Sequence, residues 1–243
     1  MNRSRVTRAV LFDLDDTLFD HRRSARAALR AVHERHAAGL EFDAFERHHA
    51  IYLEEMHLEV LAGRLGLDDA RRERFRRVFH ALGVTLDAAD VDRVASAYRS
   101  GYMEARRALD GSAALLAAIQ PRARTVIVTN NLLEEQQDKL KFCGLAPYVD
   151  VLVASQEAGV SKPDPEIFRI ALDRAGVSAD DAVMVGDSWA NDVAGARGAG
   201  IRAIWFNPLG RPKPSDPDAD AVLEIASLAP PDRVLPLLLH ASP

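Results

Sequence analysis

The sequence predicts an α/β protein built on a doubly wound, Rossmann-like parallel sheet, with an all-helical domain inserted into it. Short apolar runs rich in Val, Ile, Leu and Phe alternate with helical patterns in the second half of the chain. Continuous apolar character, without alternation, is typical of strands that helices cover on both faces. A stretch without any strand pattern, residues 20–109, separates the first apolar run from the second, and this predicts the insertion.

Five runs of four to six residues are the predicted strands, at 9–14, 125–129, 151–154, 182–186 and 202–206. The helices between the later strands are predicted at 134–142, 165–175 and 191–199. Asp164 can cap the second of these helices, and Pro165 suits its first position. The stretch 207–220 is dense in Pro and Asp and is predicted to be a loop.

The insertion is rich in Ala, Arg, Glu and Leu, with glycines at its candidate breaks, and is typical of a bundle of about four helices. We therefore predict a core domain of residues 1–19 and 110–243 and a helical domain of residues 20–109. The histidines of the insertion, His33 and His49 among them, are predicted to be solvated rather than metal-binding. No cysteine or glutamate-rich ligand frame accompanies them.

Composition and charge exclude several functions. The formal net charge of −5 gives no basic footprint, so a nucleic-acid polymer is not expected as a partner. No run of about 18 apolar residues exists to span a membrane, and the apolar run after the charged start 1–5 is too short for a signal peptide. The single cysteine, Cys143, excludes an internal disulfide and fits a reducing compartment. We therefore predict a cytoplasmic protein without a membrane partner.

Side chains capable of chemistry follow the predicted strands. Asp13 and Asp15 follow the first strand, Thr129 and Asn130 the second, and Asp187 and Asp192 the fourth, while Lys162 lies between the third and the fourth. In open α/β sheets, ligands bind outside the carboxyl ends of the strands. We therefore expect these groups to meet at one edge of the sheet.

Asp13 and Asp15 are two residues apart, so an extended chain would place both side chains on the same face. Carboxylates this close repel each other and require a cation or a shared proton. With Asp187 they offer hard oxygen ligands, which suit Mg²⁺ better than Zn²⁺. Taken singly, the aspartates are also ordinary turn residues and Lys162 an ordinary solvated lysine, so the functional interpretation depends on the whole set.

The set resembles the four motifs of the haloacid dehalogenase superfamily of phosphohydrolases. These motifs are Asp-Leu-Asp-Asp-Thr at 13–17, Thr129, Ser-Lys-Pro-Asp-Pro at 161–165, and Gly-Asp-Ser at 186–188 with Asn191 and Asp192. They occur in order and in suitable strand contexts, and the resemblance covers about residues 7–19 and 109–210. It implies the strand order 3-2-1-4-5 and identifies the helical insertion as a class-one cap, which in the family closes over the site.

The resemblance implies a role for each catalytic residue. Asp13 is the nucleophile that takes the phosphoryl group. Asp15 is the general acid that protonates the leaving oxygen and then the base that activates water. Thr129 and Asn130 bind the substrate, Thr129 at the phosphoryl oxygens, and Lys162 neutralises charge on Asp13 and the phosphate.

The resemblance also implies Mg²⁺ as the cofactor. The implied ligands of the ion are Asp13, the backbone carbonyl of Asp15, and Asp187. Asp192 is implied to contact these ligands, or to reach the ion through a water molecule. The implied function is a Mg²⁺-dependent phosphatase for a small-molecule phosphate monoester. Similarity of residues 129–141 and 155–162 to bacterial nucleotidases and N-acylneuraminate-phosphate phosphatases favours a nucleoside monophosphate or a sugar phosphate.

Three alternatives stay open at this point. A phosphomutase of the β-phosphoglucomutase type shares all four motifs. A 2-haloacid dehalogenase shares the fold, although Asp15 argues against it because the family's dehalogenases lack an acid there. A non-catalytic binding or regulatory protein is the third, and the intact nucleophile and acid argue against it. A phosphonatase would want a cap lysine, and residues 20–109 contain none.

Overall fold

The computed structural model describes residues 7–215 and 219–240. The chain divides into two compact units, which we call the core unit (Met1–Asp20 with Arg107–Pro243) and the helical unit (His21–Arg106). The charged start 1–5, considered above as a signal-peptide start, lies outside the described residues, as do 216–218 of the predicted loop and the final residues 241–243. The predicted domain roles stay a prediction: a catalytic core of residues 1–19 and 110–243, and a cap of residues 20–109.

A parallel sheet forms the centre of the core unit. Within the described residues it has six strands in the order β3-β2-β1-β4-β5-β6. The strands are β1 Ala9–Phe12, β2 Arg124–Thr129, β3 Val151–Ala154, β4 Ala182–Gly186, β5 Arg202–Phe206 and β6 Leu223–Ile225. The predicted fold class and the order 3-2-1-4-5 are confirmed. The additional edge strand β6 was not predicted, because it is three residues long and buries only its last residue.

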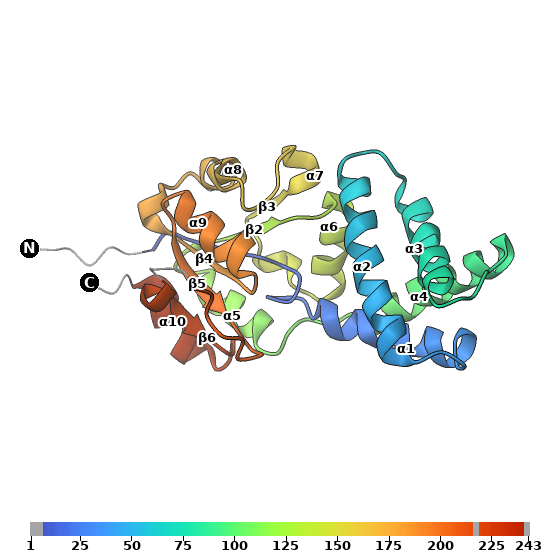
Figure 1. Cartoon of the computed structure of the whole chain (residues 1–243). Coiled ribbons are helices and arrows are strands. Elements are labelled where there is room, and N and C mark those ends of the chain that lie inside the picture. The colour runs from blue at the N-terminus through green and yellow to red at the C-terminus, as the bar shows by residue number, and fades with distance from the viewer. Residues whose placement is uncertain (1–6, 216–218, 241–243) are drawn as a thin grey trace, which may run out of the picture. The chain divides into compact units, whose positions relative to one another are not determined.

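Helices cover both faces of this sheet (Figure 1). They are α5 Ser112–Ile119, α6 Leu133–Phe142, α7 Ser155–Ala158, α8 Pro165–Ala175, α9 Gly195–Gly198 and α10 Pro231–Leu239. Helices α5 and α10 pack together on one face, and α8 and α9 pack together on the other. Phe168 of α8 and Met184 of β4 belong to one buried apolar cluster. This two-sided burial explains the continuous apolar runs.

The strand register brings the carboxyl ends of the central strands together. Phe12, the last residue of β1, lies opposite Ile127 of β2 and Val185 of β4. The residues that follow β1, β2 and β4 therefore leave the sheet at one edge. This is the edge where α/β sheets bind ligands.

The predicted helix at 191–199 differs in the structure. Trp189–Ala194 forms a π-helical turn, and α9 begins only at Gly195. The amide of Val193 donates to the carbonyl of Ser188 over five residues, at 3.3 Å. The Asp192 carboxylate accepts a hydrogen bond from the Ser188 amide at 3.0 Å, which ties the widened turn back to the end of β4. Such turns are frequent at functional sites.

The helical unit contains four helices, all of them within described residues: α1 His21–His36, α2 Phe42–Leu61, α3 Leu67–Ala81 and α4 Ala88–Ala105. The prediction that His49 is solvated is wrong, since its side chain is buried against the rings of Phe75 and Tyr98. Burial and the nearby Arg74 lower the pKa of His49. Among the described residues, no helix combines the length and apolarity that crossing a bilayer requires.

Two glycines of α9 form a matched pair for testing this packing. A Cβ on Gly195 would lie 2.9 Å from the Phe168 ring and 3.0 Å from the Pro163 Cα, whereas one on Gly198 would meet no described atom within 4 Å. We expect Gly195→Ala to lower the free energy of unfolding by about 1–3 kcal/mol through overpacking. Gly198→Ala should be neutral or stabilising by up to about 1 kcal/mol. Urea unfolding measures both, and equal effects of the two substitutions would contradict the packing.

Candidate active site

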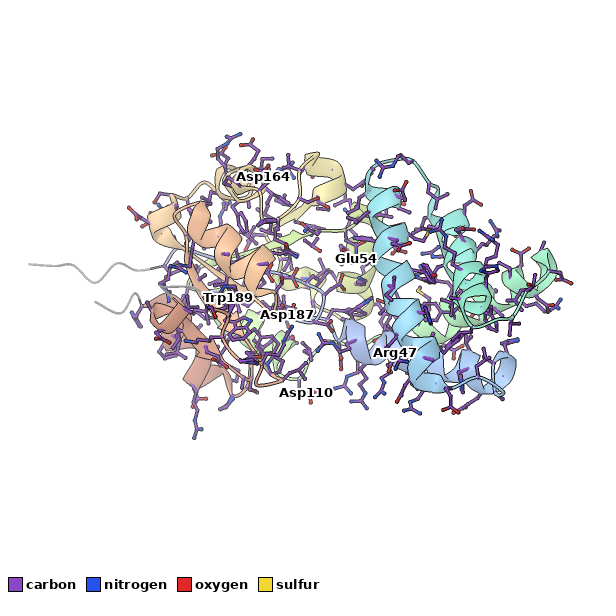
Figure 2. All side chains as sticks on the ribbon, in the orientation of Figure 1. Arg47, Glu54, Asp110, Asp164, Asp187 and Trp189 are labelled. Atoms are coloured by element: carbon purple, nitrogen blue, oxygen red, sulfur yellow. The ribbon has the colours of Figure 1, made fainter. Side chains whose placement is uncertain are left out.

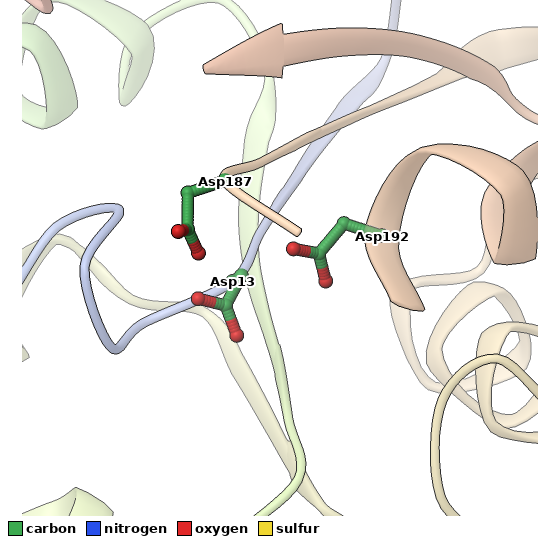
Figure 3. Close-up of side chains that lie close together, drawn as sticks. All are labelled: Asp13, Asp187 and Asp192. Atoms are coloured by element: carbon green, nitrogen blue, oxygen red, sulfur yellow. The ribbon is translucent and has the colours of Figure 1, made fainter. Parts of the chain in front are cut away.

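Three aspartate carboxylates gather at the carboxyl edge of the sheet (Figure 3). Asp13 directly follows β1, Asp187 directly follows β4, and Asp192 lies on the π-helical turn. Figure 2 labels Asp187 together with Trp189, with which that turn begins. One oxygen from each carboxylate lies within 4.8 Å of those of the other two. We call these three residues the acidic cluster.

Lys162 neutralises part of the acidic cluster. Its Nζ donates to the Oδ1 atoms of Asp13 and Asp192, at 2.7 Å in each case, and the side chain is buried. Burial alone would lower the pKa of Lys162, but the two carboxylates offset burial and the net shift is upward. Lys162 therefore stays an ammonium, as its proposed role requires.

The Asn130 amide fixes the backbone of Lys162. Its Oδ1 accepts from the Lys162 amide at 2.7 Å, and its Nδ2 donates to the Lys162 carbonyl at 2.8 Å. Thr129, which precedes Asn130 in the sequence and ends β2, is buried. The predicted contacts of Thr129 and Asn130 with substrate remain predictions. The observed function of the Asn130 amide is to hold the segment that carries Lys162.

Asp15 is held by a different ammonium. Lys139 of α6 donates to Asp15 Oδ1 at 2.6 Å and to Oδ2 at 2.8 Å. The chain turns sharply after Asp13: Asp16 has a φ of 63°, and its amide donates to the Phe19 carbonyl at 2.7 Å. Asp13 and Asp15 thus have one lysine each, where the sequence predicted a cation or a shared proton between them.

Arg211 is a further residue at the acidic cluster that the sequence analysis missed. Its Nη2 donates to Asp187 Oδ2 at 2.9 Å. Asn207 anchors the loop that carries it, because its Oδ1 accepts from the Arg211 amide at 3.0 Å and its Nδ2 donates to the Arg211 carbonyl at 2.8 Å. The rule that ligands bind at the carboxyl ends of strands, applied to β5, would have indicated this loop.

The acidic cluster carries more negative charge than Lys162 can offset. Burial raises the pKa of Asp13 to about 8, against the opposing effect of Lys162 and with a further upward contribution from Asp192. Burial also raises the pKa of Asp187 to about 6, with Arg211 acting against it and Asp192 adding to it. A site of this kind takes up protons or a cation. Its carboxylate oxygens are the ligands that Mg²⁺ prefers.

Gly186, the last residue of β4, makes room for the acidic cluster. A Cβ at this position would lie 2.3 Å from Asp192 Cγ, a separation that no side chain tolerates. Any larger residue at 186 would therefore displace Asp192, and with it one of the two carboxylates that hold Lys162.

Several known proteins are similar to this chain in sequence or in fold. A family model described as haloacid dehalogenase-like hydrolase matches residues 7–200. Pyrimidine 5′-nucleotidase YjjG of Escherichia coli is 29% identical over 84% of this chain and 88% of its own. N-acylneuraminate-9-phosphatase of Mus musculus is 29% identical over 94% of this chain and 95% of its own. The crystal structure of YfnB from Bacillus subtilis bound to magnesium superposes with a TM-score of 0.74 and 26% identity, over 96% of this chain and 99% of that one. The resemblance to the nucleotidase and N-acylneuraminate-phosphatase branch is confirmed.

The raised pKa of Asp13 predicts how stability depends on pH when no divalent cation is bound. A carboxyl group whose pKa is about 8 in the folded protein and near 4 in the unfolded chain stabilises the fold at low pH. This stabilisation is lost as the pH rises through 8. We expect the free energy of unfolding in EDTA to fall between pH 6.5 and 8, by at most about 1.4 kcal/mol per pH unit for one proton.

The control for this experiment is Asp13→Asn, in which the fall above pH 6.5 should disappear. Working above pH 6.5 also avoids His49, whose lowered pKa acts in the opposite sense at lower pH. A wild-type stability that stays flat or increases from pH 6.5 to 8 would show that Asp13 is already ionised in the metal-free protein.

Proposed function

Because this chain belongs to the haloacid dehalogenase-like hydrolases, we propose that it is a magnesium-dependent phosphatase. Its reaction is the hydrolysis of a small phosphate monoester through an aspartyl-phosphate on Asp13. The observation that carries the proposal is the position of Asp13. It lies at the carboxyl edge of the sheet, held by a buried ammonium within a cluster of carboxylates. A nucleophilic carboxylate that must approach an anionic phosphate needs positive charge close by, and Lys162 supplies part of it.

The acidic cluster supports Mg²⁺ as the cofactor. Asp13 and Asp187 offer carboxylate oxygens, Asp192 lies beside them, and Asp15 contributes its backbone carbonyl in this proposal. A bound Mg²⁺ supplies positive charge that offsets the repulsion between carboxylate and phosphate. The relative YfnB was crystallised with magnesium, which favours the same ion here.

The proposed reaction has two steps that share one proton carrier. An Asp13 oxygen attacks the phosphorus while the bond to the ester oxygen breaks, and Asp15 gives its proton to that leaving oxygen. Asp15 then takes a proton from the water that attacks the phosphorus, and the bond to Asp13 breaks to release phosphate. In both steps Lys162 balances the charge on Asp13, and Thr129 donates to the phosphoryl oxygens.

The proposed substrates are nucleoside monophosphates and sugar phosphates. Support comes from the names of the two phosphatase relatives, one a pyrimidine 5′-nucleotidase and the other an N-acylneuraminate-9-phosphatase. The presence of an acid at position 15 supports phosphoryl transfer over dehalogenation. A phosphomutase would use the same residues, and it differs in leaving the phosphate on its product instead of releasing it.

The test is phosphate release from a panel of nucleoside monophosphates, sugar phosphates and p-nitrophenyl phosphate, in Mg²⁺ or in EDTA. We expect release in Mg²⁺ only. Asp13→Asn should lower it by at least about 10³-fold, because the nucleophile is lost. The preferred panel member identifies the substrate class.

Two results would contradict the proposal. Full activity of Asp13→Asn would exclude the aspartyl-phosphate. No release from any ester by folded, Mg²⁺-loaded protein would exclude the phosphatase, and isomerised sugar phosphate in that experiment would identify a mutase. Arg122→Gln, which alters an exposed arginine of the core unit, is a control that should retain wild-type release.

A further inference from the structure

Three side chains from one segment of the chain, residues 131–139, donate hydrogen bonds to the Asp15 carboxylate. Asn131 Nδ2 donates to Oδ2 at 3.2 Å, Gln136 Nε2 donates to Oδ2 at 3.0 Å, and Lys139 Nζ contacts both oxygens. Gln136 and Lys139 are three residues apart on α6 and so share one face of that helix. Both are buried in a helix whose neighbouring polar residues, Gln137 and Lys141, are exposed.

The Gln136 amide is buried at a cost in free energy. Its side chain has no exposed surface, and no described atom donates a hydrogen bond to its Oε1. An unsatisfied buried acceptor costs about 1–3 kcal/mol. Rotating the amide by half a turn would direct Oε1 at the Asp15 carboxylate, so the contact with Asp15 dictates the observed orientation. The fold thus keeps an unsatisfied polar atom in order to place one donor on Asp15.

The choice of lysine at position 139 is also informative. Lysine is rare in this chain: of its 31 Lys and Arg residues, only those at 139, 141, 162 and 213 are lysines, and the rest are arginines. Two of the four are buried, and each holds a different catalytic aspartate: Lys162 holds Asp13 and Lys139 holds Asp15. Lys139 Nζ also lies 5.1 Å from the centre of the buried Phe19 ring. The compact ammonium of Lys139 thus lies within hydrogen-bonding distance of both Asp15 oxygens.

We propose that Lys139 and Gln136 are positioning residues, which hold the Asp15 carboxylate in the place from which it gives and takes the proton of the reaction. This inference rests on the proposed phosphatase function. Asn131, Gln136 and Lys139 all donate to Oδ2, and Lys139 also donates to Oδ1, so both carboxylate oxygens are held in place.

A role in proton transfer differs from a structural ion pair in its dependence on the leaving group. An alkoxide leaving group must be protonated as it departs, whereas p-nitrophenolate departs without a proton. A displaced general acid therefore slows cleavage of a sugar or nucleoside phosphate far more than cleavage of p-nitrophenyl phosphate. A structural defect slows both substrates alike.

The experiment compares Lys139→Met and Gln136→Leu with the wild type, in Mg²⁺, on the best alkyl phosphate of the panel and on p-nitrophenyl phosphate. For Lys139→Met we expect kcat/KM on the alkyl phosphate to fall about 10- to 100-fold, since general acid catalysis supplies about 10²- to 10⁴-fold. On p-nitrophenyl phosphate it should fall by less than about 3-fold. KM should stay near its wild-type value, and Gln136→Leu should show the same pattern with a smaller loss.

Lys141→Met and Gln137→Leu are the matched controls, because they make the same changes at exposed positions of the same helix. Both should retain wild-type kinetics on both substrates. Equal losses on the two substrates, or no loss in Lys139→Met and Gln136→Leu, would overturn the positioning role while leaving the phosphatase intact. An inactive wild type would overturn the proposed function, and this inference with it. Should Lys139→Met fail to fold, Gln136→Leu alone decides between these outcomes.

Discussion

The arrangement of this site depends on one constraint: four aspartates, two of them buried, must be accommodated at one edge of the sheet. Burying ionised carboxylates without partners is prohibitively costly. The fold answers with two separate buried ammonium groups, Lys162 on Asp13 and Asp192, and Lys139 on Asp15. Charge is balanced at Asp15, where one ammonium meets one carboxylate. It is not balanced in the acidic cluster, and that local excess is what makes the cluster suitable for a divalent cation.

Most of the surrounding structure serves to hold those charged groups in place. The parallel register brings the ends of β1 and β4 to one edge, so Asp13 and Asp187 meet without any long loop. The Asn130 amide fixes the backbone at Lys162. The π-helical turn and Gly186 together let Asp192 reach the cluster. Each of these features fixes the position of a charged side chain to which our proposal gives a chemical role, which is how sites on rigid elements gain precision.

The sequence predicts the sheet and the acidic cluster because their residues directly follow strands, and strands are visible as apolar runs. Asp13 and Asp187 could be placed at one edge by that rule alone. Lys139 could not, since its role depends on the rotation of α6, and its neighbours Gln137 and Lys141 look equivalent in the sequence. Arg211 depends on a loop whose path is set by hydrogen bonds of Asn207. Periodicity does not encode such contacts, and lysine's rarity in this chain was the available signal.

The two lysines also divide the aspartates between two kinds of chemistry. The acidic cluster found among the described residues consists of Asp13, Asp187 and Asp192 and does not include the Asp15 carboxylate. An unpaired carboxylate two residues from Asp13 would compete for any cation that the cluster binds. An ammonium at 2.6 Å removes that competition by giving Asp15 a partner that is part of the protein. On our proposal the same contact that positions Asp15 for proton transfer therefore also keeps it apart from the ligands of the metal.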